Sequence, residues 1–120
     1  MKKVLVVDDS LYMRTMISDA LIKSGYEIVA QAANGESAIA MALEHKPDLI
    51  TLDNILPDMI GIDILRVLKQ ENNIESKIIM ISAVGQELVV KEGMSLGASN
   101  YIVKPFTAQS LVEEVNKVFQ

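Results

Sequence analysis

The stretch Val4-Leu5-Val6-Val7-Asp8-Asp9-Ser10 decides the fold, because it joins a continuous apolar run to two adjacent carboxylates. The first four residues are all valine or leucine. Such a run, without polar alternation, is typical of a strand buried on both faces of a parallel sheet. The serine that follows is favoured at helix N-caps. The stretch therefore predicts a buried strand that ends in two aspartates and leads directly into a helix.

Four more apolar runs repeat this pattern, and each is short and without polar alternation. The runs are Ile28-Val29-Ala30, Leu49-Ile50-Thr51-Leu52, Ile78-Ile79-Met80-Ile81 and Tyr101-Ile102-Val103. Apolar residues at helical spacing lie between the runs and after the last one. One set is Met13, Met16, Ile17, Ala20 and Leu21. A second set, at the end of the chain, is Leu111, Val115, Val118 and Phe119. The turn and cap residues at the junctions are Gly25, Asn34, Gly35, Pro47, Gly97 and Thr107. Five strand-then-helix units predict an α/β fold, a doubly wound parallel sheet of five strands with five helices on its two faces.

The length and composition limit what the chain can do. A chain of 120 residues with 50% hydrophobic content forms one compact domain, residues 1–120, and leaves no room for a separate effector domain. A net charge of -5 argues against binding to nucleic acid. The absence of cysteine and the single histidine, His45, argue against disulfides, thiolate metal sites and a histidine-based catalytic set.

The chain also lacks the sequence marks of secretion or membrane insertion. The four apolar residues before Asp8 are too few for a signal peptide, and no apolar run approaches the length that spans a bilayer. We therefore expect a cytoplasmic protein that makes no membrane contact. Its output would have to pass through contact with another protein.

Polar side chains follow four of the five predicted strands. They are Asp8 and Asp9 after the first strand, Asp53 after the third, Ser82 after the fourth and Lys104 after the fifth. In doubly wound sheets, ligands bind beyond the carboxyl ends of the strands, where the strand order reverses. The sequence therefore predicts one carboxylate-rich site at that edge of the sheet.

The residue types at this edge suit a magnesium ion and a phosphoryl group. Crowded carboxylates repel one another, and a hard divalent cation that prefers oxygen ligands relieves the repulsion. Lys104 offers a positive charge for a phosphate, and Ser82 offers a hydroxyl donor. Asp53 is the best candidate for a nucleophile that forms an aspartyl phosphate, since it stands alone at the end of a central strand.

These motifs resemble the receiver domains of two-component response regulators, and among them most closely the single-domain chemotaxis members. The matching segments are Val7-Asp8-Asp9-Ser10 with Met13-Arg14, Ala33-Asn34-Gly35-Glu36, Asp53 to Pro57 with Gly61, Ser82-Ala83 and Lys104-Pro105-Phe106. The resemblance covers the whole chain and implies a flavodoxin-like sheet with strand order 2-1-3-4-5. It also implies that a histidine kinase phosphorylates Asp53.

The resemblance implies further roles at the site. Asp9 and Asp53 would bind Mg²⁺ directly, Asp8 would act largely through bound water, and the backbone carbonyl of Ile55 would complete the protein ligands. The remaining implied roles are Ser82 as the switch hydroxyl, Lys104 as the phosphate-binding lysine, Tyr101 as the aromatic that moves inward on activation, and Pro105 as the second residue of a cis peptide bond. The protein would then be a phosphoacceptor switch that catalyses only its own phosphorylation and dephosphorylation.

The implied partners are proteins. A histidine kinase would be the phosphodonor, and the target in a chemotaxis setting would be the flagellar switch or another motor adaptor. A phosphatase or a histidine phosphotransfer protein would be a further partner, and we expect the chain to be a monomer. The surface formed by the fourth helix, the fifth strand and the fifth helix would change its affinity for the target.

Four positions affect the details of the site. Ile60 replaces a turn-favouring residue before Gly61, which leaves the shape of this loop open. Asn54 is polar where the family usually has an aliphatic residue, and Ile55 offers no polar side chain near an attacking water. With Val84, these residues leave the lifetime of the phosphorylated state undetermined.

Other functions remain open from the residues alone. The chain would also suit a relay intermediate that passes its phosphoryl group to a histidine phosphotransfer protein, or a receiver excised from a larger regulator such as a chemotaxis methylesterase. A phosphatase of the haloacid dehalogenase type needs a second aspartate two residues after the nucleophile, where this chain has Ile55. A flavin-binding module is disfavoured, because Asp8 and Asp9 would repel the phosphate that it cradles.

Overall fold

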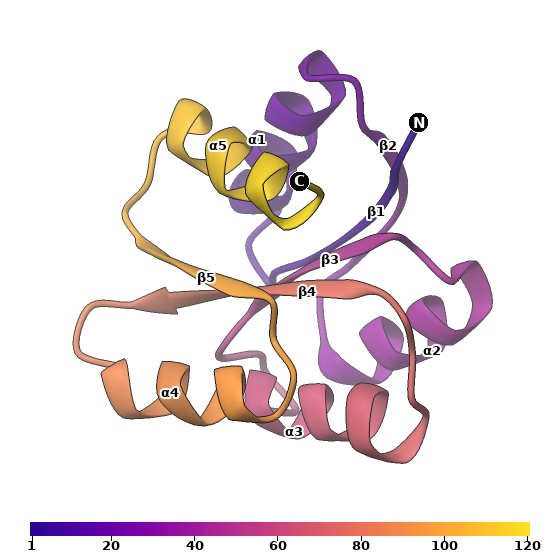
Figure 1. Cartoon of the computed structure of the whole chain (residues 1–120), viewed down its shortest axis with the longest axis vertical. Helices are drawn as coiled ribbons and strands as arrows, with labels where there is room; N and C mark the ends of the chain where they lie inside the picture. Colours follow the sequence, from indigo (N-terminus) through magenta and orange to yellow (C-terminus); the bar gives the residue numbers. More distant parts are fainter.

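The computed structural model describes all 120 residues and contains one five-stranded sheet. The strands are β1 (Lys3–Val7), β2 (Glu27–Ala32), β3 (Leu49–Asp53), β4 (Lys77–Ala83) and β5 (Asn100–Lys104). They are parallel throughout and lie in the order β2-β1-β3-β4-β5 (Figure 1). Both the predicted fold class and the implied strand order are confirmed.

Helices cover both faces of the sheet. They are α1 (Leu11–Lys23), α2 (Gly35–His45), α3 (Gly61–Leu65) with its continuation η1 (Arg66–Glu71), α4 (Glu87–Ser95) and α5 (Ala108–Val118). Figure 1 shows α1 and α5 on one side of the sheet, and α2, α3 and α4 on the other. Each side has its own apolar core, one of 11 buried residues under α1 and α5 and one of 15 under the other helices. None of the helices combines the length and apolar character needed to cross a membrane.

The predicted caps begin and end the helices as expected. Ser10 accepts a hydrogen bond from the Met13 amide at the start of α1, and Asn34 accepts one from the Ser37 amide at the start of α2. Thr107 forms a capping box at the start of α5. These caps fix where each helix starts, and hence the short loops that lead into α1 and α2.

The expectation that every strand is buried on both faces is wrong for the two edge strands. In β5, Ile102 is buried, whereas Tyr101 and Val103 on either side of it are exposed. In β2, only Ala32 is fully buried. An edge strand has one neighbour and incomplete helix cover, so an apolar run alone does not distinguish it from a central strand.

The third helix changes its winding along its length. After one short α-helical segment, the chain continues from Arg66 to Glu71 as a π-helix, a form that is rare in proteins. The amine of Lys69 in this segment donates hydrogen bonds to the carbonyls of Ile74 (3.1 Å) and Ser76 (2.6 Å). Burial lowers the pKa of this amine, and the nearby Lys77 lowers it further. Lys69 therefore ties η1 to the residues that lead into β4.

The central strand contains a buried hydroxyl without a partner, which leads to a stability prediction. Thr51 is completely buried between its register partners Val6 and Ile79, and its Oγ1 makes no hydrogen bond. Thr51→Val keeps the shape and removes the unsatisfied group, so we expect the free energy of unfolding to rise by about 1 kcal/mol. Thr51→Ser, which keeps the hydroxyl and loses a methyl group, should lower it by a similar amount. Urea denaturation measures both variants, and a loss of stability in Thr51→Val would contradict the prediction.

Candidate functional site

The strand register brings three charged side chains to one face of the sheet at its carboxyl edge. Side chains along a strand alternate between faces, so Asp8 shares a face with Val6, and Lys104 shares one with Ile102. Asp53 pairs with Ile81 across β3 and β4. All three apolar neighbours belong to the core under α1 and α5. Asp8, Asp53 and Lys104 therefore extend the same face beyond the end of the core.

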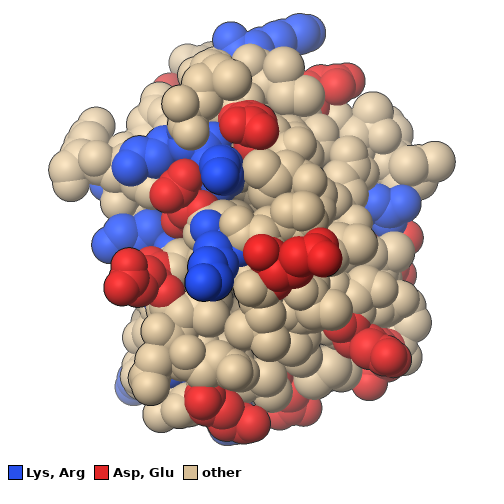
Figure 2. Space-filling model, turned by 90° about the vertical axis from the view of Figure 1, so that its right-hand side faces the viewer, with Lys and Arg blue, Asp and Glu red and all other residues tan.

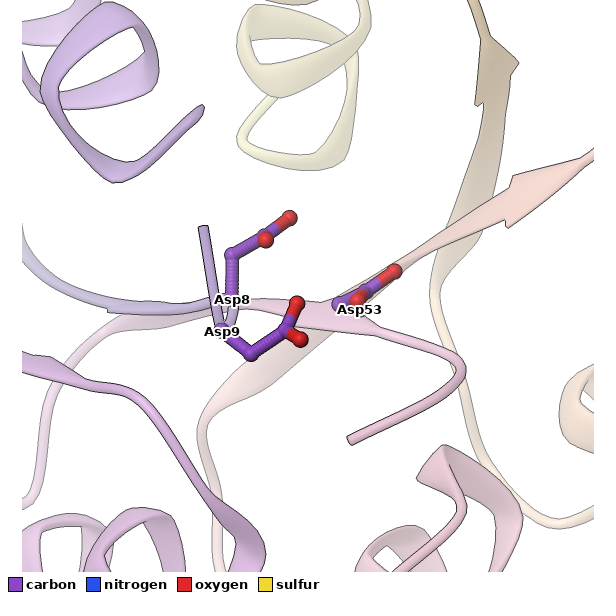
Figure 3. A group of neighbouring side chains, drawn as sticks. All are labelled: Asp8, Asp9 and Asp53. Carbon is purple, nitrogen blue, oxygen red and sulfur yellow. The ribbon is translucent and has the colours of Figure 1, made fainter. Parts of the chain in front are cut away.

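The three predicted aspartates form a compact cluster. Asp8, Asp9 and Asp53 each offer a carboxylate oxygen, and these oxygens all lie within 4.8 Å of one another. Figure 3 shows the three side chains reaching from the ends of β1 and β3 toward one region. Asp8 and Asp53 are buried, whereas Asp9 is exposed. The cluster therefore has two oxygen donors inside the protein and one at its mouth.

Lys104 supplies the cation of the site. Its Nζ lies 3.3 Å from Oδ2 of Asp8 and 3.2 Å from Oδ1 of Asp53, so one amine bridges the two buried carboxylates. Burial works against the charge on this amine, but the Asp53 and Asp8 carboxylates outweigh burial and raise the pKa of Lys104. The amine is therefore held in its charged form beside the proposed nucleophile.

The carboxyl of Asp53 has a raised pKa. Burial is the main cause, and the charge of Asp8 adds to it, while Lys104 acts in the opposite direction. The single amine of Lys104 is shared between two carboxylates, and its effect on Asp53 does not overcome burial. Additional positive charge at this position would favour ionised Asp53.

Two contacts that the sequence did not suggest hold Asp8 in place. Its Oδ1 accepts a hydrogen bond from the Ser10 amide at 2.9 Å, which leaves Oδ2 for Lys104. The guanidinium of Arg14, one turn into α1, donates to the Asp8 backbone carbonyl at 2.7 Å. The first turn of α1 thus positions the first carboxylate from both its side chain and its backbone.

The loop after β3 has a regular shape despite Ile60. Ile55 and Ile60 form an antiparallel bridge, flanked by hydrogen bonds from the Leu56 amide to the Met59 carbonyl and from the Gly61 amide to the Asn54 carbonyl. Ile60 has an extended backbone with φ of -90°, so this position does not need a turn-favouring residue. In this bridge the Ile55 carbonyl accepts no backbone hydrogen bond.

Asp58 in the same loop makes a connection that sequence reasoning missed. Its two carboxylate oxygens accept hydrogen bonds from the amides of Gly35 (2.7 Å) and Glu36 (3.0 Å) at the start of α2. These bonds lower the pKa of Asp58. An aspartate next to a helix N-terminus is recognisable only when the two segments are known to be neighbours, and they are more than 20 residues apart.

The predicted switch residues lie around the site without hydrogen bonds to the aspartates. Ser82 is buried, and its Oγ has no hydrogen-bond partner. Tyr101 is 43% exposed and lines a surface groove of about 270 Å³ together with Ser82, Val84 and Val90. The Lys104–Pro105 peptide bond is cis, the form expected from the sequence.

Comparison with known proteins identifies the family. The model of the response regulator receiver domain matches residues 4–116. The chain belongs to the response regulator receiver family. Among curated relatives of this receiver domain, the chemotaxis protein CheY of Bacillus subtilis is 45% identical over 115 residues, which cover 96% of this chain and 95% of that protein. CheY of Thermotoga maritima is 44% identical over 118 residues, which cover 98% of this chain and 97% of that protein.

Solved structures of receiver domains have the same fold. Chemotaxis regulator CheY4 of Vibrio cholerae superimposes with a TM-score of 0.90 at 33% identity, and covers 98% of each chain. CheY of Borrelia burgdorferi, solved as a complex with CheX, beryllofluoride and magnesium, gives a TM-score of 0.93 at 34% identity over 99% of this chain and 90% of that one.

The acidic cluster of this receiver domain fits a magnesium ion. The donors are hard oxygen atoms from Asp8, Asp9 and Asp53. Lys104 is the one amine that pairs with these three carboxylates, and it contacts only Asp8 and Asp53, so the cluster carries excess negative charge. A site with these properties favours a small divalent cation over a softer metal.

Proposed function

We propose that this receiver domain is a phosphorylation-dependent switch in which Asp53 accepts a phosphoryl group from a histidine kinase. The observation that carries the proposal is the bridge that Lys104 makes between Asp8 and Asp53, beside the exposed Asp9. In the transfer, the N–P bond of a phosphohistidine breaks and a bond forms between phosphorus and a carboxylate oxygen of Asp53. The histidine leaves with the electron pair of the broken bond.

Each residue of the site has a distinct role in this proposal. Asp9 and Asp53, with the Ile55 carbonyl, would hold Mg²⁺ directly, and Asp8 would hold it through water. Bound Mg²⁺ supplies positive charge that lowers the repulsion between the carboxylates and the incoming phosphoryl oxygens. The Lys104 amine pairs with the phosphoryl group, and the unpartnered Ser82 hydroxyl donates a hydrogen bond to it.

The similarity to CheY proteins and an exposed surface support the proposed output. Four CheY proteins are 41–45% identical to this chain over nearly its whole length, which supports a role in chemotaxis as a stand-alone cytoplasmic regulator formed by residues 1–120. The groove beside Tyr101 and the exposed side chains of Val84 and Leu88 lie over α4 and β5. We infer that a change at Ser82 alters this surface, and with it the affinity for a motor component or adaptor.

Incubation with acetyl phosphate and Mg²⁺ tests the proposed function. Intact-mass spectrometry should show a mass increase of one phosphoryl group, and a chelator should prevent it. Beryllofluoride with Mg²⁺ provides a second test, because it imitates a phosphoryl group on a carboxylate without a covalent reaction. A protein that neither gains mass nor binds beryllofluoride would contradict the proposal.

Mg²⁺ should stabilise the fold through Asp9. At a Mg²⁺ concentration about ten times its Kd, binding adds about 1.4 kcal/mol to the free energy of unfolding. Asp9→Ala removes the exposed ligand, so this variant should gain much less at the same concentration. Thermal denaturation with and without Mg²⁺ measures the difference, and the exposed Asp19, which lies on α1, supplies the control Asp19→Ala. An equal gain in wild type and Asp9→Ala would show that the ion binds elsewhere.

A further inference from the structure

A second pair of polar side chains lies behind the phosphoacceptor, on the opposite face of the sheet. Leu52 of β3 and Met80 of β4 are register partners, and both belong to the core under α2, α3 and α4. Residues two positions further along each strand return to this face. These residues are Asn54 and Ser82. The Asn54 amide donates to the Ile81 carbonyl at 3.0 Å, so the ladder between the strands continues to this point.

Asn54 and Ser82 are both buried and both incompletely bonded. They are 4% and 1% exposed, and neither Oδ1 of Asn54 nor Oγ of Ser82 has a hydrogen-bond partner. Buried polar atoms without a partner are rare in folded proteins. The two atoms are complementary, because an amide oxygen accepts hydrogen bonds and a serine hydroxyl donates one.

We propose that the Asn54 side-chain oxygen is an alternative acceptor for the Ser82 hydroxyl, reached by rotation of the serine side chain, and competes with a phosphoryl group on Asp53 for that single donor. This inference rests on the proposed function of Ser82. A serine side chain has three staggered positions about its Cα–Cβ bond, and rotation among them changes which acceptor the hydroxyl reaches. Because the hydroxyl has one proton, a hydrogen bond to Asn54 disfavours one to the phosphoryl group.

Asn54 and Ser82 share a face of the sheet, because each lies two positions beyond the register partners Leu52 and Met80. In the proposed function Ser82 is the member of this pair that donates to the phosphoryl group. The Asn54 side chain therefore acts through Ser82, which makes Asn54 a positioning residue that opposes activation.

The experiment compares beryllofluoride affinity in the presence of Mg²⁺ by isothermal titration calorimetry. Asn54→Leu keeps a side chain of similar size and removes the acceptor. Loss of one competing neutral hydrogen bond should tighten beryllofluoride binding by about 2- to 10-fold. Asn54→Ala, which also removes the acceptor, should tighten binding in the same direction, and it replaces Asn54→Leu if leucine does not fit.

Two further variants separate the proposed competition from a change in packing. In a Ser82→Thr background, which keeps a hydroxyl donor, removing the Asn54 acceptor should still tighten binding. In a Ser82→Ala background, the effect should disappear. Weaker or unchanged beryllofluoride binding in Asn54→Leu would overturn this inference but leave the proposed function intact. The same holds if removing the Asn54 acceptor tightens binding equally in the Ser82→Ala background. A wild-type protein that binds no beryllofluoride would overturn the proposed function as well.

Discussion

Asp53→Asn should abolish phosphorylation of the protein by acetyl phosphate. The neutral amide is a much weaker nucleophile than the carboxylate, so it should not accept the phosphoryl group. The other carboxylate that Lys104 contacts, Asp8, is already held through its Oδ1 by the Ser10 amide. Intact-mass spectrometry after incubation with Mg²⁺ and acetyl phosphate measures the result. A mass increase equal to that of the wild type would show that the phosphoacceptor is a different residue.

The same variant should be more stable than the wild type without metal at neutral pH. The pKa of Asp53 is raised by burial and by Asp8, so the folded protein binds this proton more tightly than the unfolded chain does. The stability of the wild type therefore falls as pH rises from the ordinary carboxyl pKa through the raised value, and stays lower above it. Asp53→Asn removes this loss.

Thermal denaturation in a chelator checks the stability prediction. The melting temperature of Asp53→Asn should exceed that of the wild type near pH 7, and the difference should shrink toward about pH 3, where the carboxyl is protonated in both states. Asp19→Asn, which makes the same charge change on the exposed side of α1, is the control and should leave the melting temperature nearly unchanged. A lower melting temperature for Asp53→Asn at pH 7 would show that its pairing with Lys104 outweighs burial.

The clustering of the charged residues at the site could be predicted from the sequence, whereas the contacts that hold them in position could not. Each aspartate and Lys104 directly follows or ends an apolar run, and the geometry of a parallel sheet brings the ends of such runs together. The support of Asp8 by Arg14, by contrast, depends on how the first turn of α1 is oriented over the strand end. The cap that Asp58 makes on α2 depends on two loops being neighbours in space. Neither contact leaves a periodic pattern in the sequence.

The fold shows the same division. Strand positions could be predicted within two residues, because the apolar runs Val4–Val7 and Ile78–Ile81 have no other stable place than a sheet interior. Burial of the edge strands could not be predicted, since Tyr101 and Val103 belong to an apolar run but lie in β5 at the open side of the sheet. The π-helical winding of Arg66–Glu71 carries no signal of its own in the sequence.

Gly61→Ala should damage both the stability of the fold and the phosphoacceptor. A Cβ at this position would lie 3.0 Å from the Asn54 Cα and 3.0 Å from the Asp53 carbonyl oxygen. Both are backbone atoms, and the Gly61 amide is already held at 2.6 Å from the Asn54 carbonyl, so the neighbours cannot move independently of Asp53. We expect the free energy of unfolding to fall by about 2 kcal/mol, since overpacking exceeds the helix propensity that alanine adds.

Phosphorylation distinguishes this effect from a general loss of stability. Because the backbone that must move carries the nucleophile, Gly61→Ala should gain phosphoryl groups from acetyl phosphate more slowly even where it is fully folded. Gly93→Ala in α4 is the control, because its Cβ would overlap the sulfur of Met80. Met80 belongs to the core on the opposite face of the sheet from the Asp53 side chain, so this variant should lose stability and keep the rate. Equal phosphorylation rates in Gly61→Ala and Gly93→Ala, measured by intact mass at a temperature where both are folded, would contradict the proposed link. If the rates differ as expected, glycine at position 61 serves two purposes. It lets the loop close, and it lets the backbone of Asp53 keep the position that the phosphoacceptor needs.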